Sequence, residues 1–334
     1  MDDLSPNETA PPNEEEFTRW YLDRMDTFHA KVAAEKCGGE IRRAFHTKTI
    51  AGARATFTPA ENRPPELRVG IGAADGSLDA YIRFSSGQCF ARPDHVPDTR
   101  GIAVKLLGVA GDPLPGTPSG VQDLLAISND LHSIRDGQQF ANMSLLAPSF
   151  FASSFQVWKY TGLSGGLRIG AGFLKIAREG RKSLPSSAYF GMAPISFGDV
   201  PAKICFVPLS VGRTKHVRPG KDALSKNLLR HLLAGPLEWE LRVQLFIDDA
   251  TTPVEDLTVC WDRAASPFLP LGTLRLHQVA SAEDFAANAQ AVEGLAFSPW
   301  NGLACHRPLG SVQRIRRWAY KQSAERRGAS ACPI

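Results

Sequence analysis

The chain has 334 residues and a mass of 36.3 kDa, and 43% of its residues are hydrophobic, which is enough for a substantial core. With 38 basic and 34 acidic residues, the formal charge of +4 is too small to indicate nucleic-acid binding. The sequence has no apolar run long enough for stable membrane insertion and no secretory signal at its start, so we expect a cytoplasmic protein.

The first 14 residues are acidic and rich in proline and asparagine, and we expect a disordered tail there. From residue 15 to about 36, apolar residues recur every three or four positions, which predicts an amphipathic helix that stops at Gly38 and Gly39. Strand-like segments follow at 47–58, 66–72, 78–86 and 101–108. The turn at 74–77 predicts a hairpin between the second and third of them.

The middle of the chain, about 121–183, lacks strand alternation and predicts a helical insertion, with helices at 134–145, 148–160 and 166–181. Strands resume at 187–190, 203–210, 237–248 and 271–280, and further helices are expected at 222–234, 283–292 and 311–326. Strands without intervening helices favour an antiparallel sheet. We therefore predict an α+β fold with one eight-stranded antiparallel β-barrel, a helical insertion and flanking helices, in a single domain over residues 15–334.

Arg316 and Tyr320 are four residues apart in the last predicted helix, so their side chains share one face. A guanidinium beside a phenol stabilises the phenolate, and an ionised tyrosine is a hard metal ligand. An ordinary amphipathic helix with a packed tyrosine and a solvated arginine has the same spacing. Both interpretations are open on spacing alone.

A second group of polar residues surrounds His46, where the first predicted strand begins. Arg43 precedes His46 by three residues, and Arg83 and Ser85 share one face of another predicted strand. Arginine forms bidentate pairs with carboxylates, and the Ser85 hydroxyl could hydrogen-bond the His46 ring. The alternatives are a packed histidine and arginines that lie on the surface or in salt bridges.

Several stretches, taken in chain order, resemble the catalase superfamily, and in particular its small haem-containing branch of catalase-related proteins, the minicatalases or haem-dependent peroxidases. The resemblance extends from about residue 40 to 327. It is carried by Arg43-x-x-His46, Arg83-Phe84-Ser85, residues 98–105, 189–198, 261–268, 274–276 and 297–301, and Arg316-x-x-x-Tyr320.

The resemblance implies a catalase-like barrel around haem b (iron). Tyr320 would be the proximal metal ligand, and Arg316 would support its phenolate. By the family pattern, Arg43 and Arg83 would hold the haem propionates.

On the distal side, the resemblance implies that His46 is the catalytic acid/base and that Ser85 orients it. Gln122 would take the place of the distal asparagine of catalases, and Thr47 follows His46 where a small residue is commoner. These departures argue against fast hydrogen peroxide dismutation rather than against haem binding.

The implied function is that of a haem-dependent peroxidase-type oxidoreductase, with weak catalase activity. Its partners would be hydrogen peroxide or an organic peroxide and a small organic reductant. A fatty-acid hydroperoxide-transforming enzyme similar to allene oxide synthase and a non-catalytic haem-binding sensor or store are the alternatives. Because the chain lacks the C-terminal helical domain and long N-terminal arm of large catalases, a homodimer is expected rather than their tetramer.

Overall fold

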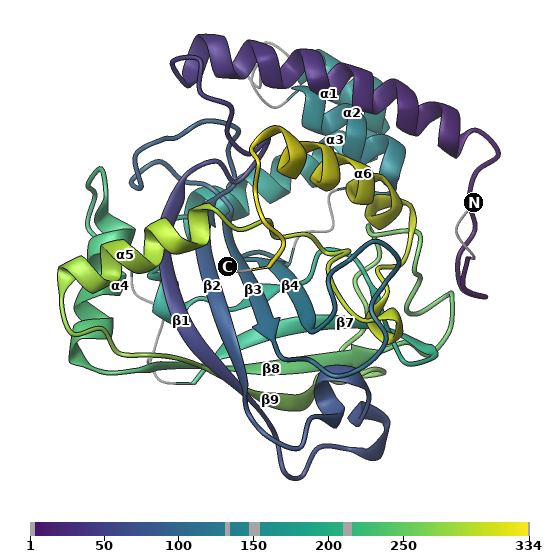
Figure 1. Ribbon diagram of the computed structural model, residues 1–334. Coiled ribbons are helices and arrows are strands. Elements are labelled where there is room, and N and C mark those ends of the chain that lie inside the picture. Colours follow the sequence, from purple (N-terminus) through teal and green to yellow (C-terminus); the bar gives the residue numbers. More distant parts are fainter. Residues whose placement is uncertain (1–3, 131–133, 147–153, 210–215, 333–334) are drawn as a thin grey trace.

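The computed structural model describes residues 4–130, 134–146, 154–209 and 216–332 (Figure 1). Its centre is one antiparallel sheet in the order β5-β4-β3-β2-β1-β9-β8-β7, which closes into an eight-stranded barrel because β5 also pairs with β7. One further strand, β6, extends from β7. The predicted α+β barrel is therefore confirmed. The strands are β1 Thr49–Pro59, β2 Leu78–Ser86, β3 Arg100–Leu107, β4 Val121–Ile127, β5 Tyr189–Phe190, β6 Ile195–Phe197, β7 Val200–Pro208, β8 Leu237–Leu245 and β9 Leu269–Leu276.

The barrel interior is filled by alternate side chains of every long strand. Phe84 of β2 and Trp239 of β8 meet across it, with ring centroids 6.1 Å apart. Since neighbouring side chains on a strand point to opposite faces, Arg83 and Ser85 of β2 lie on the outside of the barrel. Paired residues of adjacent strands share a face, so this outer face continues through Gly101 of β3.

Helices cover this outer face and one end of the barrel. Figure 1 shows α1, α2, α3 and α6 gathered above the barrel, while α5 runs along β1 and β2. Gly52 of β1 permits the close approach of α5, because a Cβ there would collide with the backbone of Asn288. The helices are α1 Glu14–Lys36, α2 Gly137–Leu146, α3 Ser154–Glu179, α4 Ala223–Ala234, α5 Ala282–Glu293 and α6 Ser311–Arg326.

The predicted helices are present with small shifts of their ends. The helices expected at 148–160 and 166–181 appear as α3, whose backbone is non-helical at Gly162, and residues 147–153 lie outside the described part. The prediction for α1 is confirmed, since its apolar positions Tyr21, Met25 and Val32 are buried. Gly38 has a positive φ of 62°, which suits the end of a helix.

Two strand assignments from the sequence are wrong. Residues 66–72 form short 3₁₀ turns, Pro65–Leu67 and Gly70–Ala73, so no hairpin joins them to β2. Gly70, with φ 51°, packs directly against His306, and a turn fits this space where a strand would not. Conversely, β4 lies in the part that was predicted to be helical, because its buried Gln122 and Asp123 interrupt the apolar pattern.

Residues 4–13, within the segment expected to be a disordered tail, contact the rest of the chain. Residues 4–13 contain no helix or strand, but the Glu8 side chain is buried. Its carboxylate accepts hydrogen bonds from Arg314 Nη1 and the Gly310 backbone, each at 2.8 Å, and pairs with Arg307. A buried carboxylate needs such partners, and they anchor this segment to the start of α6.

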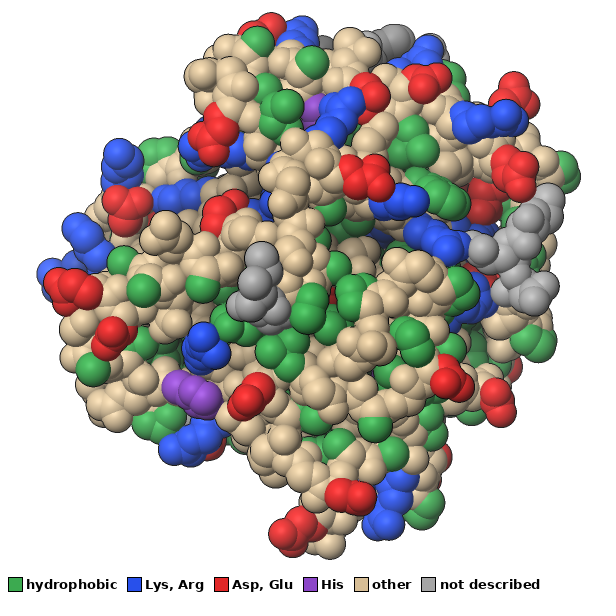
Figure 2. Space-filling model, viewed as in Figure 1, with side chains coloured by type: hydrophobic (Ala, Val, Ile, Leu, Met, Phe, Trp, Pro, Cys, Tyr) green, Lys and Arg blue, Asp and Glu red, His purple; other side chains and the backbone are tan. Residues whose placement is uncertain are grey.

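No helix in the described residues is long and apolar enough to cross a lipid bilayer. On the face shown in Figure 2, basic and acidic side chains are interspersed, and hydrophobic side chains are scattered among them. The view therefore shows no extended area of one charge.

Candidate active site

His46 lies at the bend where the chain enters β1. Its φ of 54° is in the left-handed region, which non-glycine residues rarely adopt. Its backbone N–H donates to Gly87 O (3.2 Å), its carbonyl accepts from Arg83 Nη2 (2.7 Å), and its Nδ1 lies 3.0 Å from Ser85 Oγ. These contacts hold the strained backbone and fix the ring, and they include the hydrogen bond expected between Ser85 and His46.

The imidazole of His46 lies directly on the backbone of β3. A Cβ at Gly101 would be 2.7 Å from its Nδ1 and Cε1 and 2.9 Å from Ser85 Oγ. These separations are shorter than any ordinary carbon contact, so a larger residue at 101 would displace the ring. Glycine at this position is therefore part of the site, although the sequence pattern around it gave no reason to single it out.

His46 is neutral at physiological pH. Burial lowers its pKa to about 3, and the positive charges of Arg83 and Arg316 act in the same direction. Its Nδ1 is engaged by Ser85, whereas its Nε2 has no hydrogen-bond partner among the described residues. The ring therefore presents a free nitrogen that can accept a proton or a hydrogen bond from a ligand.

The predicted pair on α6 is also in contact. Arg316 Nη2 donates to Tyr320 Oη at 3.0 Å, and its guanidinium lies 5.1 Å from the centre of the phenol ring. Arg316 is buried, and its Nη1 donates to Gln313 Oε1 at 3.0 Å. The guanidinium is thus held between Gln313 and Tyr320. Trp300 Nε1 donates to the Gln313 carbonyl at 2.7 Å and fixes the backbone of Gln313. The Arg316–Tyr320 contact shows that the two side chains meet on one face of α6, as expected.

Arg43 and Arg83 converge on one carboxylate, Glu293 at the end of α5. Arg43 forms an ion pair with it, and Arg83 Nε lies 3.7 Å from its Oε2. The guanidinium of Arg327 is within electrostatic reach of this group. Burial and the charge of Arg43 lower its pKa to about 10, while Glu293 acts in the opposite direction. Two guanidinium groups pair with one carboxylate, which leaves positive charge for an anionic ligand.

Sequence reasoning did not assign Arg327 and Glu293 to the site. For Arg327 a signal exists, since it follows Tyr320 by seven residues, two turns of an α-helix, and thus returns to the same side of α6. Glu293 carries no such signal, because it is brought to Arg43 only by the packing of α5 on β1.

Gln122, which is expected to be the distal amide, does not lie with these residues. It pairs with Leu106 and shares the interior face of the barrel with Leu124, whereas Ser85 points outward. Its amide is already engaged, since Oε1 accepts from Leu303 N at 2.9 Å and Nε2 donates to the Asp123 carbonyl at 3.0 Å.

The outward neighbour of Gln122 is Asp123, which forms a fully buried ion pair with Lys105 of β3 at 2.6 Å. Its second oxygen accepts from Ser298 N (2.9 Å) and Asn301 Nδ2 (3.0 Å). These bonds tie residues 297–301 across β3 and β4. The pair thus positions the segment that leads into α6, and with it the Arg316–Tyr320 contact.

The residues predicted from sequence, apart from Gln122, therefore surround one region between the outer face of β1–β3 and α6. The effect of Arg316 on the pKa of His46 places the two within electrostatic reach of each other. The region combines a neutral imidazole, a phenol bonded to a guanidinium, and a cationic cluster. This donor set suits a ligand that carries carboxylates and a metal ion that accepts an oxygen ligand.

Comparisons with known proteins point to one fold. The sequence matches no protein-family model and no curated protein, but its structure is similar to several solved structures. A fungal catalase superposes with a TM-score of 0.68 at 16% identity, over 87% of this chain and 61% of the other. A bacterial catalase gives 0.65 at 17%, over 100% and 66% of the two chains, and catalase A from Saccharomyces cerevisiae gives 0.64 at 16%, over 87% and 64%.

The chain spans roughly three fifths to two thirds of the length of these catalases, by 61%, 66% and 64% in turn. Sequence identity at this level supports a shared fold only. The expectation drawn from the sequence motifs is confirmed at that level: the protein has a catalase-like fold, closed around the same eight-stranded barrel.

Proposed function

We propose that the protein is a haem-dependent peroxidase-type oxidoreductase, which reduces hydrogen peroxide or organic peroxides with a small organic reductant. The observation that carries this proposal is the pair of contacts on either side of one region: Arg316 to Tyr320 on α6, and Ser85 to His46 on the barrel. A catalase-like fold, which suits an oxidoreductase that handles peroxides, supports it.

The donor set fits haem b. Tyr320 would hold the iron through its phenolic oxygen, to which Arg316 Nη2 donates at 3.0 Å. Arg43, Arg83 and Arg327 would hold the two propionates, because their combined charge exceeds that of Glu293. When bound, haem supplies the redox-active iron at which the O–O bond of the peroxide is broken.

The protein's own contribution centres on His46. As a neutral base, it accepts a proton at Nε2 from the first oxygen of a peroxide and returns that proton to the second oxygen as the O–O bond breaks. Ser85 holds the ring through Nδ1, so Nε2 keeps its direction during both transfers. Burial keeps water away from the transferred proton.

The position of Gln122 bears on which peroxide reaction is favoured. Its amide bonds inside the barrel, so it does not assist His46 in orienting a second peroxide molecule. We therefore expect peroxidase turnover with an organic reductant to exceed hydrogen peroxide dismutation.

An absorption spectrum tests the haem proposal. The purified protein, loaded with haem, should show a high-spin ferric Soret band that changes in Tyr320→Phe and is kept in the control Tyr81→Phe, whose ring packs against Arg54. Haem that binds equally well, with the same spectrum, in all three proteins would contradict tyrosinate ligation.

Product analysis tests the reaction. Oxidation of a phenolic reductant together with loss of peroxide is the expected result. An isomerised lipid hydroperoxide without use of reductant would instead indicate the allene oxide synthase-like alternative. Stoichiometric haem with no turnover of any peroxide would indicate a sensor or store. A homodimer stays a prediction, which light scattering of the purified protein checks.

A further inference from the structure

Lys203 of β7 is a buried cation that lacks a direct partner. Its residue exposure is only 6%, yet among the described residues its ammonium makes no hydrogen bond and no ion pair within 4.0 Å. Its Nζ lies 4.8 Å from the centre of the Trp261 ring. A cation–π contact offsets only part of the cost of burying a charge. Such a lysine is expected to react, to bind a ligand or to give up its proton.

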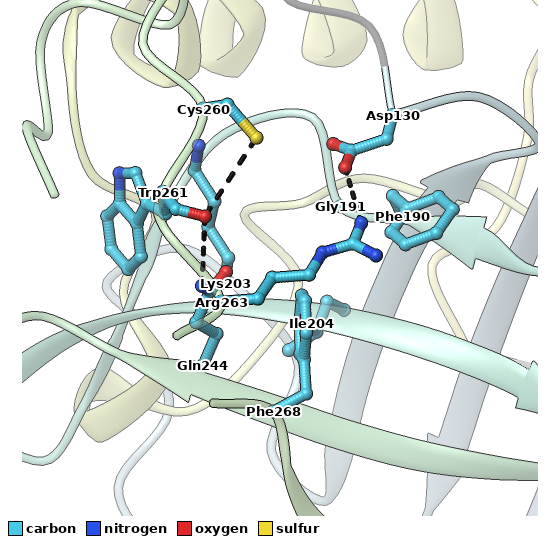
Figure 3. A pocket seen from close by; sticks show the side chains of 10 residues that line it. All are labelled: Asp130, Phe190, Gly191, Lys203, Ile204, Gln244, Cys260, Trp261, Arg263 and Phe268. Atoms are coloured by element: carbon cyan, nitrogen blue, oxygen red, sulfur yellow. Dashed lines mark hydrogen bonds and ion pairs between the residues drawn. The ribbon is translucent and has the colours of Figure 1, made fainter. Parts of the chain in front are cut away.

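Lys203 lines a small recess on the outside of the barrel (Figure 3). The aromatic rings of Phe190, Phe268 and Trp261 form its walls, and a volume of about 10 Å³ leaves room for a single water-sized molecule. Cys260, from the segment between β8 and β9, lines the same recess. A space of this size excludes a bulky organic ligand.

Cys260 differs from Cys205, which lies two residues after Lys203 on β7. Cys260 is an exposed free thiol, so a dissolved oxidant reaches it directly. Cys205 is buried, and burial raises its pKa to about 12, which makes it inert. Lys203 is also suited to act as a nucleophile, since burial lowers its pKa to about 8 while Asp130 and Cys260 act in the opposite direction. The influence of Cys260 places the thiol within electrostatic reach of the amine.

We propose that peroxide joins Cys260 and Lys203 in a sulfenamide cross-link, which makes this recess a peroxide-responsive modification site. Hydrogen peroxide transfers one oxygen atom to the thiol, which gives a sulfenic acid and one water molecule. The neutral amine of Lys203 then attacks the sulfur. An S–N bond forms, the S–O bond breaks, and the hydroxyl leaves with a proton of the amine as a second water molecule.

The step is balanced without any further reactant. The sulfur is oxidised by two electrons, the peroxide is reduced to water, and the protein loses two hydrogen atoms. The link fastens the segment between β8 and β9 to β7, and a thiol reductant reverses it. This site is separate from the region around His46, and the reaction needs no haem.

The experiment uses the full-length protein, with and without haem, treated with hydrogen peroxide, blocked at free thiols and digested with a protease that does not depend on lysine. The expected product is one linked species that contains residues 203 and 260, lighter by two hydrogen atoms than the two peptides together. Dithiothreitol should release both peptides. Because the haem-free sample reports on the link by itself, its outcome is distinct from that of the peroxidase proposal.

Variants identify the two atoms. Lys203→Met should abolish the link and leave Cys260 as a sulfenic acid that dimedone labels, while Cys332→Ser, at another exposed thiol, should leave the link intact. Wild-type Cys260 that stays a thiol, or that becomes dimedone-reactive or sulfinic without joining Lys203, would overturn the proposal. The wild-type result decides even if Lys203→Met does not fold.

Discussion

Replacement of His46 by asparagine tests the proton-transfer role most directly. Asparagine tolerates the left-handed backbone better than alanine does, so His46→Asn keeps the φ of 54° at little added strain. It removes the nitrogen that has no partner and that would accept the peroxide proton. General acid–base catalysis contributes roughly 10² to 10⁴ in rate, or about 3 to 5 kcal/mol of barrier.

The assay is steady-state peroxide turnover with a phenolic reductant, normalised to bound haem. We expect kcat/KM for peroxide to fall by at least about a hundredfold in His46→Asn, in line with the range above. In His277→Asn, at an exposed histidine whose side chain bonds to Thr56, it should stay unchanged. Wild-type activity should keep its value from pH 7 to 5, since His46 takes up a proton only near pH 3. Activity of His46→Asn within threefold of wild type, at normal haem content, would refute the reasoning.

Other substitutions test the supports of the site. Gly101→Ala places a methyl group 2.7 Å from the His46 ring and should lower peroxide turnover in a folded, haem-binding protein. Asp123→Asn leaves the fully buried Lys105 unpaired and should cost about 3 to 5 kcal/mol in urea unfolding. His306, whose pKa burial lowers to about 4, takes up its proton more readily when unfolded, so stability should fall as pH drops from 6.5 to 4. His306→Gln should remove about 3 kcal/mol of that fall, measured by unfolding at each pH.

Matched variants separate these effects from general damage. Gly76→Ala, where a Cβ meets open space, should leave turnover unchanged. A double change of Lys105→Met with Asp123→Leu removes both charges and should recover much of the stability that Asp123→Asn loses. Equal losses in the single and double variants would contradict the account of the ion pair. A parallel pH dependence in wild type and His306→Gln would contradict the assignment to that histidine.

Much of the architecture could be predicted from local patterns. Strands whose interior residues are uniformly apolar, such as β2 with Ile82 and Phe84, alternate clearly, and α1 repeats its apolar residues at helical spacing. The Arg316–Tyr320 contact is consistent with the helix geometry on which the prediction rested, because residues four apart lie on one face of a helix.

The predictions that differ from the structure have a common physical cause: buried polar side chains whose partners are distant in the sequence. In β4, Gln122 and Asp123 are both buried, one bonded inside the barrel and the other to Lys105 outside it, so no alternation is visible. A shift of one residue along a strand moves a side chain to the opposite face of the sheet, and Gln122 lies on the interior face. Glu8 was hidden in the same way, since only the folded α6 brings Arg314 to it.

The anchoring of Glu8 has a practical consequence for work with this protein. The ten or so residues before α1 would ordinarily be trimmed, or replaced by an affinity tag and protease scar. Here their loss would remove Glu8, the partner of Arg307 and one of the acidic partners of Arg314, and expose the Gly310 N–H at the start of α6. Because α6 also carries Tyr320, poor haem content in a shortened variant would reflect the loss of these residues rather than the haem affinity of the full-length protein.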